Sequence, residues 1–126
     1  MSLEVESGIS MRGISSVLSK FGAKISVDGD GVSGNFEGSN AYFVFRECHG
    51  FEEVVTEEIN VSWGVGVRGA FHCPGNLLAE SYDDIKRFLS FLAERESCRF
   101  ILSFQYESIY AIRDEAGLRF IKEMVG

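Results

Sequence analysis

The chain has 126 residues, of which 45% are hydrophobic and 25% charged, with 14 glycines and one proline; this composition indicates a single globular domain, residues 1–126, and excludes a disordered chain. Nineteen acidic against twelve basic residues leave a net charge of −7. Nucleic acids and anionic membranes bind basic surfaces, so this charge argues against both partners and fits a soluble protein or one with a basic partner.

The first ten residues have neither a basic n-region nor an apolar h-region, and no apolar run reaches the length of a membrane span. The three cysteines, Cys48, Cys73 and Cys98, are odd in number and lie in apolar stretches. We therefore expect a cytoplasmic protein with free thiols.

The spacing of apolar residues predicts a first helix over about residues 8–21. Ser7 or Ser10 is expected to cap its start, and Gly22 stands where a glycine commonly ends a helix. Alternating patterns then predict three strands on short turns, which favours an antiparallel meander; the strands are expected at 23–27, 32–36 and 41–46.

Alternation returns over residues 59–73, with Ile59, Val61, Trp63, Val65, Val67 and Phe71 on one face. This length exceeds a usual strand, so its glycines predict a bend, a bulge or a split into two strands. A second helix is expected from an N-cap at Ser81, with Asp84 in the capping-box position, to about Glu96. Later strands are predicted at 100–106 and 108–112, and a strand or short helix at 118–124.

These elements predict an α+β fold with a twisted, mainly antiparallel sheet of five to seven strands and two helices packed on one face. Tyr42 and Phe43 are neighbouring aromatics that point to opposite faces of their strand. Part of the second sheet face is therefore expected to be covered, for example by a partner.

No motif predicts a catalytic, cofactor or metal site. Gly64, Gly66 and Gly69 spell G-x-G-x-x-G, but no helix start follows them, which favours a bent strand over a dinucleotide site. The pairs Cys48-His49 and His72-Cys73 match no metal-ligand spacing, and core cysteines are the preferred interpretation. Residues 28–31 resemble the start of a calcium loop without its later ligands, so a hairpin turn is expected there.

The most unusual stretch is acidic, with five glutamates within residues 47–58. It is either a solvated loop or a surface that attracts a basic partner. Phe51, Val54 and Val55 lie between the acids and either anchor an interface or face the core. The two aspartates of the turn at 28–31 would project from its tip. The predicted contact residues are therefore Glu47, Phe51, Glu52, Glu53, Glu57, Glu58, Asp28 and Asp30.

Two segments, 47–51 (ECHGF) and 110–118 (YAIRDEAGL), resemble small bacterial toxin-immunity proteins of the contact-dependent growth-inhibition type. The resemblance implies a cytoplasmic protein that is not an enzyme and that binds the C-terminal domain of a toxin. Such toxin domains are often nucleases with basic clefts, so acidic and aromatic side chains would neutralise them by blocking the active site.

Two alternatives remain open. A small enzyme would use a cysteine and a histidine of the pairs Cys48-His49 or His72-Cys73. A homo-oligomeric structural module would pair an exposed aromatic sheet face with itself. For the immunity type we expect a monomer or a weak dimer in the absence of the toxin domain.

Overall fold

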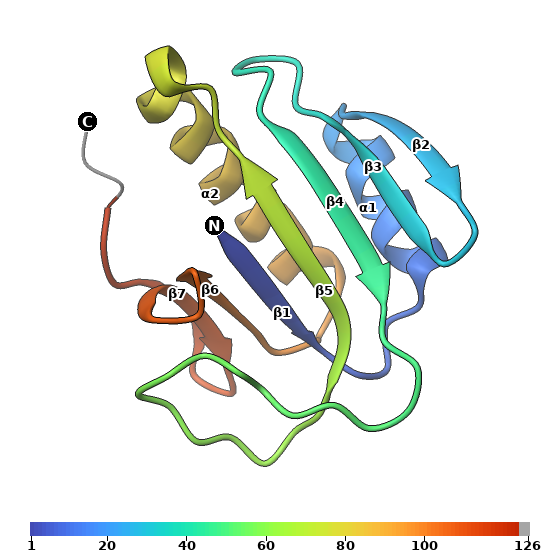
Figure 1. Ribbon diagram of the computed structural model, residues 1–126, viewed down its shortest axis with the longest axis vertical. Coiled ribbons are helices and arrows are strands. Elements are labelled where there is room, and N and C mark those ends of the chain that lie inside the picture. The colour runs from blue at the N-terminus through green and yellow to red at the C-terminus, as the bar shows by residue number, and fades with distance from the viewer. Residues whose placement is uncertain (124–126) are drawn as a thin grey trace.

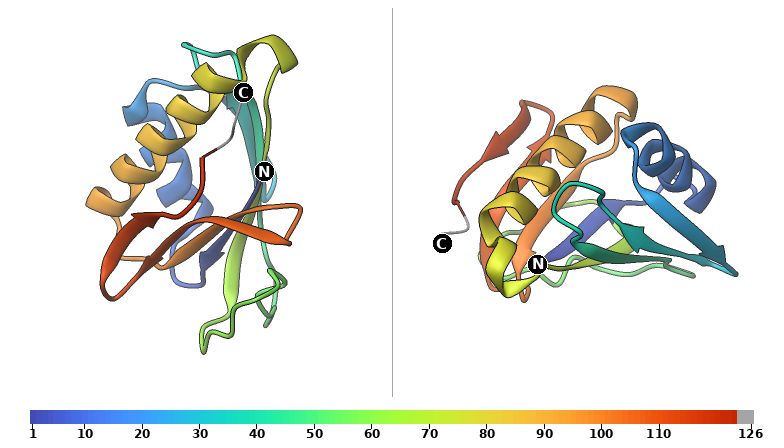
Figure 2. Two further views of the ribbon diagram at one scale, coloured as in Figure 1. Left: turned by 90° about the vertical axis from the view of Figure 1, so that its left-hand side faces the viewer. Right: turned by 90° about the horizontal axis from the view of Figure 1, so that it is seen from above.

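Within residues 1–123, eight antiparallel strands form one open, twisted sheet, and two α-helices pack against the same face of it (Figure 1, Figure 2). The computed structural model describes residues 1–123. Across the sheet the order is β2-β3-β4-β5-β1-β6-β7-β8. The strands are β1 (Ser2–Glu6), β2 (Lys24–Asp28), β3 (Gly31–Asn35), β4 (Tyr42–Glu47), β5 (Val65–His72), β6 (Phe100–Phe104), β7 (Ser108–Asp114) and β8 (Gly117–Phe120). The helices are α1 (Met11–Phe21), the 3-10 helix η1 (Gly75–Leu77) and α2 (Leu78–Arg95).

The predicted α+β class with two helices on one face is confirmed, but the predicted five to seven strands were too few. The strand that the sequence pattern missed is β1, which lies between β5 and β6 near the middle of the sheet. Ser2 pairs with both Ala70 and Ser103. Only Leu3 and Val5 mark the alternation, and so short a pattern identifies a strand only once its distant partners are known.

Helix α1 and its two ends follow the sequence prediction. The Ser10 hydroxyl caps the start by accepting from the amide of Gly13 at 3.1 Å. Gly22 ends the helix in the left-handed conformation with φ of 100°, which glycine adopts without strain. The following meander is confirmed as well, with β2 and β3 joined through Gly29 at φ of 60°.

The predicted N-cap of α2 was wrong. The chain passes from Pro74 through η1 directly into α2, so Ser81 lies inside the helix and is fully buried. Asp84 likewise makes no capping box, because its carboxylate accepts from the amide of Ser39 at 2.8 Å. That contact ties α2 to the turn between β3 and β4.

The predicted strand over residues 59–73 was wrong in its first half. Only Val65–His72 forms a strand, and residues 59–64 belong to the loop before it. Val67 and Phe71 enter the main core, whereas Trp63 and Val65 pack with Ile101 in a second, smaller cluster. The register of β5 shifts opposite Val5 and Glu6, which fits the predicted bulge.

The main core lies between the helices and the sheet and is built largely from phenylalanine rings. Their centroids are 5.0 to 6.4 Å apart, within the range for favourable edge or tilted contacts. The rings in contact are Phe36, Phe43, Phe45, Phe71 and Phe88.

The sheet twists so that its last strands lie beside α2 (Figure 2). The hydroxyl of Tyr82 in α2 donates to the carbonyl of Lys122, just beyond β8. The segment 118–124, predicted as a strand or short helix, forms a strand over Gly117–Phe120. Met124 lies outside the described residues. Among the helices of the described residues, none is long and apolar enough to span a membrane.

Candidate functional site

Residues 48–64, here called the acidic loop, join β4 to β5 (Figure 1). They pack on the sheet face that the helices leave free, where Val54, Ile59, Val61 and Trp63 contact Ile101 of β6 or its neighbours. The covering expected on this face is thus supplied in part by the chain itself.

Backbone hydrogen bonds hold the acidic loop at both ends and in its middle. Cys48 donates to Gly66 and Val65 donates to Glu52, each at 2.8 Å. In the middle, the amide of Glu57 donates to the carbonyl of Tyr106 at 2.8 Å. The loop therefore has a defined path although it contains neither helix nor strand.

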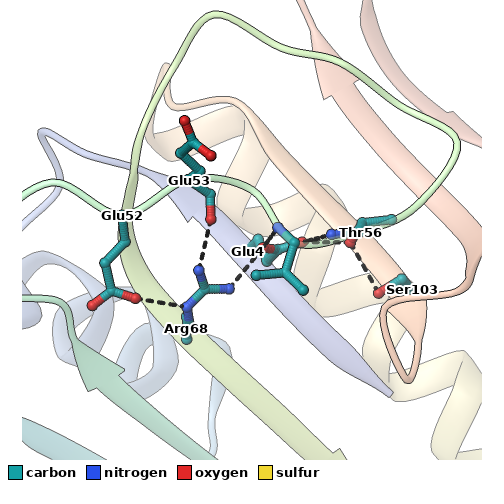
Figure 3. Close-up of polar contacts among 7 residues, drawn as sticks. Glu4, Glu52, Glu53, Thr56, Arg68 and Ser103 are labelled. Carbon is teal, nitrogen blue, oxygen red and sulfur yellow. Dashed lines mark hydrogen bonds and ion pairs between the residues drawn. The ribbon is translucent and has the colours of Figure 1, made fainter.

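Glu4 of β1 is the centre of the side-chain contacts beneath the loop (Figure 3). It is 0% exposed, and its carboxylate accepts from the amides of Val55 at 2.7 Å and Thr56 at 3.1 Å. It also accepts from the Thr56 hydroxyl and from Nη1 of Arg68 at 2.7 Å. A buried carboxylate is tolerated only when paired and hydrogen-bonded, and Glu4 is both.

Arg68 of β5 connects Glu4 to the first part of the acidic loop (Figure 3). Besides Glu4, its guanidinium donates to the Glu52 carboxylate at 3.2 Å and to the Glu53 carbonyl at 2.8 Å. The ring of Tyr106 lies 5.9 Å from its Cζ. Burial alone would lower the pKa of Arg68, but the hydrogen bonds with Glu4 and Glu52 outweigh it and raise that pKa. These contacts therefore stabilise the charged form of Arg68.

Tyr106 stands in a strained turn beside the loop. Gln105 and Tyr106 both have positive φ, 53° and 62°, and Glu107 donates to Phe104 across them at 3.0 Å. Two successive residues with positive φ are usually Asn-Gly. Having Gln and Tyr there instead costs the backbone of the order of 1–3 kcal/mol for each residue. The geometry presents the Tyr106 ring to Arg68 and its carbonyl to Glu57.

The predicted contact residues in the loop divide into two groups. Glu52 turns inward to Arg68 and is structural, with 41% of its side chain exposed. Phe51 is 79% exposed and lies against Gly64, where an added Cβ would be 3.0 Å from its ring. Val55 is 55% exposed. Three glutamates are exposed on the same loop: Glu53, Glu57 and Glu58.

The other predicted contacts gather where β4 meets the β2–β3 turn. The Asp30 carboxylate accepts a hydrogen bond from Nε2 of His49 at 2.8 Å, and Nη1 of Arg46 lies 3.8 Å from it. The amide of Glu47 donates to the carbonyl of Asp30 at 2.9 Å. Asp28 is exposed at the end of β2. The structure thus brings Asp30 and Glu47 to the start of the acidic loop.

The Asp30–His49 contact makes this junction sensitive to pH. Their hydrogen bond raises the pKa of His49 and lowers that of Asp30. The stability that the folded protein gains from His49 is fully present below the ordinary pKa of about 6.5, and it is lost as the pH rises through the raised pKa. The stability gained from Asp30 is lost as the pH falls through the lowered pKa of its carboxyl group. Both effects are therefore fully present between about pH 4 and 6.5.

We expect Asp30→Asn to lower the titration midpoint of His49 towards about 6.5, because the carboxylate that stabilises the imidazolium is removed. NMR titration of the His49 ring protons measures this midpoint. Asp28→Asn, a change at an exposed neighbour in the same hairpin, is the matched control and should leave it nearly unchanged. Equal midpoints in wild type and Asp30→Asn would show that the contact does not exist in solution.

The cysteines do not have the properties of a nucleophile. Burial raises the pKa of all three thiols, for Cys98 to about 11. A reactive cysteine requires the opposite shift, towards the thiolate. Within residues 1–123, no three Cys, His, Asp or Glu side chains are placed to hold a metal ion.

The glycine pattern in β5 also has a packing explanation. A Cβ at Gly66 would lie 2.5 Å from Cα of Ser7, and one at Gly69 would lie 2.2 Å from the Phe45 ring. These glycines allow neighbouring groups to approach the strand closely, as expected for a bent strand rather than a nucleotide site.

Comparisons of the chain with protein-family models, with curated proteins and with solved structures returned no match.

The residues that sequence reasoning missed are the ones that hold the loop: Glu4, Thr56, Arg68, Ser103 and Tyr106. A usable signal was present at two of them. Glu4 stands between the apolar residues Leu3 and Val5, and Arg68 interrupts a strand of apolar residues and glycines. Opposite charges on two strands indicate an ion pair only when the strands are neighbours.

Proposed function

We propose that this protein is a binding inhibitor of the immunity type that its sequence resembles, and that it neutralises a basic toxin domain by covering the domain's active site with the acidic loop. The observation that supports this most is the fully buried Glu4, which together with Arg68 holds an acidic, partly apolar loop in a defined conformation. A loop held in this way is suited to binding another macromolecule.

A loop that is already ordered binds at a lower entropic cost. Fixing the backbone of one residue costs about 1–2 kcal/mol, and an ordered interface side chain costs about 0.5–1.5 kcal/mol. In this loop the backbone amides of Val55, Thr56 and Glu57 are already hydrogen-bonded to the body of the protein. The cost of ordering this part of the backbone is therefore met during folding, not during association.

The exposed side chains of the loop have the composition of an interface. Aromatic and aliphatic anchors surrounded by polar groups are typical of the centre and rim of protein contacts. Here Phe51 and Val55 are the anchors, and Glu53, Glu57 and Glu58 supply the charge. A nuclease cleft is basic because it holds a phosphate backbone, so this surface and the net charge of −7 complement it.

The proposal implies that a toxin is encoded beside this gene, and the test uses the C-terminal domain of that toxin. We expect the two purified proteins to co-elute in size-exclusion chromatography at roughly 50 mM salt, and the association rate to fall as salt screens the attraction. Failure to co-elute at low salt would contradict the proposal.

In the same complex, Phe51→Ala is expected to raise the dissociation rate roughly 30-fold, the effect of an aromatic anchor worth about 2 kcal/mol. Because Phe51 is 79% exposed, the free energy of unfolding should change by no more than about 0.5 kcal/mol. Surface plasmon resonance measures the rates. The control is Phe120→Ala, since Phe120 is exposed on β8 and its ring lies beside Lys86 of α2. Equal dissociation rates for the two variants would show that Phe51 is not part of the interface.

A further inference from the structure

Strand β2 is a free edge of the sheet, because it pairs with β3 on one side and stands last in the strand order. Its sequence, Lys24-Ile25-Ser26-Val27-Asp28, has no proline and no charge in the middle three residues. Val27 is 60% exposed. Natural edge strands usually carry a central charge, a proline or a bulge that prevents pairing with another chain. The centre of β2 has none of the three.

The geometry of the β2–β3 hairpin determines which backbone groups face outward. Asp28 and Gly31 flank a two-residue turn with Gly29 at φ of 60°, and such flanking residues exchange their hydrogen bonds. Since the pattern alternates, Ile25 and Val27 direct their N–H and C=O groups away from β3. An added Cβ at Gly34 would lie 1.8 Å from the carbonyl oxygen of Lys24 and 3.0 Å from Cα of Ile25, so the two strands approach closely there.

We propose that β2 pairs with β2 of a second copy of this chain, antiparallel and centred on Ser26, so that two sheets become one. In this register Ile25 lies opposite Val27 of the second copy, and both present outward-facing backbone groups. The arrangement is two-fold symmetric and closes as a dimer. It goes beyond the proposed function and does not depend on the acidic loop.

Charge favours this register over its alternatives. Antiparallel pairing centred on Ser26 sets Lys24 opposite Asp28 of the second copy, twice per dimer, and opposite charges on facing residues stabilise a sheet. Parallel pairing would set like charges beside each other. A shift of one residue would place Ile25 opposite Ser26 and set the helix-covered face of one copy beside the free face of the other.

Five paired residues make a small interface, below the usual size of a stable complex. We therefore expect a weak dimer, with a dissociation constant of roughly 10–100 µM. Sedimentation equilibrium over this concentration range measures it.

Disulfide trapping tests the register. Ser26 faces Ser26 of the second copy as a pair without mutual hydrogen bonds, where Cα atoms lie about 4.5 Å apart, close enough for a disulfide. Ser26→Cys should form a covalent dimer under mild oxidation. Lys24→Cys is the matched control, because the two copies of residue 24 lie about 13 Å apart along the strands. Wild type gives the background from its three half-buried thiols. Equal cross-linking of the two variants would overturn the register.

A charge exchange tests the same pairing without cysteines. Lys24→Asp alone and Asp28→Lys alone should each weaken the dimer about tenfold, because both ionic pairs become repulsive. The double variant should restore the wild-type dissociation constant. Circular dichroism confirms that each variant is folded. A chain that stays monomeric at 100 µM, or a double variant as weak as the singles, would contradict the proposal.

Discussion

Replacing Glu4 by alanine is expected to lower the free energy of unfolding by about 3–5 kcal/mol, because breaking a buried ion pair leaves the other charge uncompensated. Arg68 keeps its contacts with Glu52, Glu53 and the Tyr106 ring, but the amides of Val55 and Thr56 lose their acceptor. Urea denaturation measures the change. This loss is a large part of the stability of a small domain.

Glu53→Ala is the matched control for stability, because its side chain is exposed and only its carbonyl binds Arg68. It should change the free energy of unfolding by no more than about 0.5 kcal/mol. If Glu4→Ala is too unstable to study, Glu4→Gln keeps the shape and removes the charge. In that variant the Val55 and Thr56 amides should exchange with solvent faster, relative to the amides of β6. A loop that stays as protected as in wild type would show that Glu4 does not hold it.

Replacing Glu53, Glu57 and Glu58 together by lysine is expected to slow association with the basic toxin domain about 100-fold at low salt, because attraction becomes repulsion at the docking surface. Glu52 is left in place, since it binds Arg68 and its loss would disturb the loop itself. Stopped-flow mixing at several salt concentrations measures the rate, and the difference from wild type should shrink as salt increases.

The control for this variant changes the net charge equally at another place. Glu37, Glu80 and Glu94 are exposed, on the β3–β4 turn and on α2, and their exchange for lysine also adds six units of charge. The control should slow association much less, because charge acts most strongly within a Debye length of the contact. If both triple variants slow association equally, the association rate depends on the net charge alone, and the acidic loop is not the docking surface.

The two proposals assign different parts of the sheet to different partners. The acidic loop covers the free face near β1 and β6, whereas the proposed self-pairing uses the β2 edge. Asp28 was predicted to contact the toxin, and the structure places it on this edge strand. Lys24→Asp alone therefore separates the proposals, because it should weaken the dimer about tenfold without slowing the association of the toxin domain.

Local patterns were sufficient for the elements that are stabilised within themselves. Helix α1, its Ser10 cap and its Gly22 end depend on contacts only a few residues apart, and the β2–β3 hairpin depends on pairs no more than 11 residues apart. The exposure of the acids was also predictable, because charge clusters seldom enter a core, whereas the position of Phe51 was left open between an interface and the core.

Tertiary contacts alone decided where β1 lies, why Glu4 is buried and how the acidic loop is held. β1 pairs with strands about 65 and 100 residues away, so its two apolar side chains carry too little local information. Glu4 is stable inside the protein only because Arg68 and the amides of the loop surround it, and these groups meet only after the sheet has formed. The sequence by itself therefore determined the helix, the meander and the acidic character of the loop. Its attachment to the sheet depended on long-range pairing, since a charge is buried favourably only where distant partners converge.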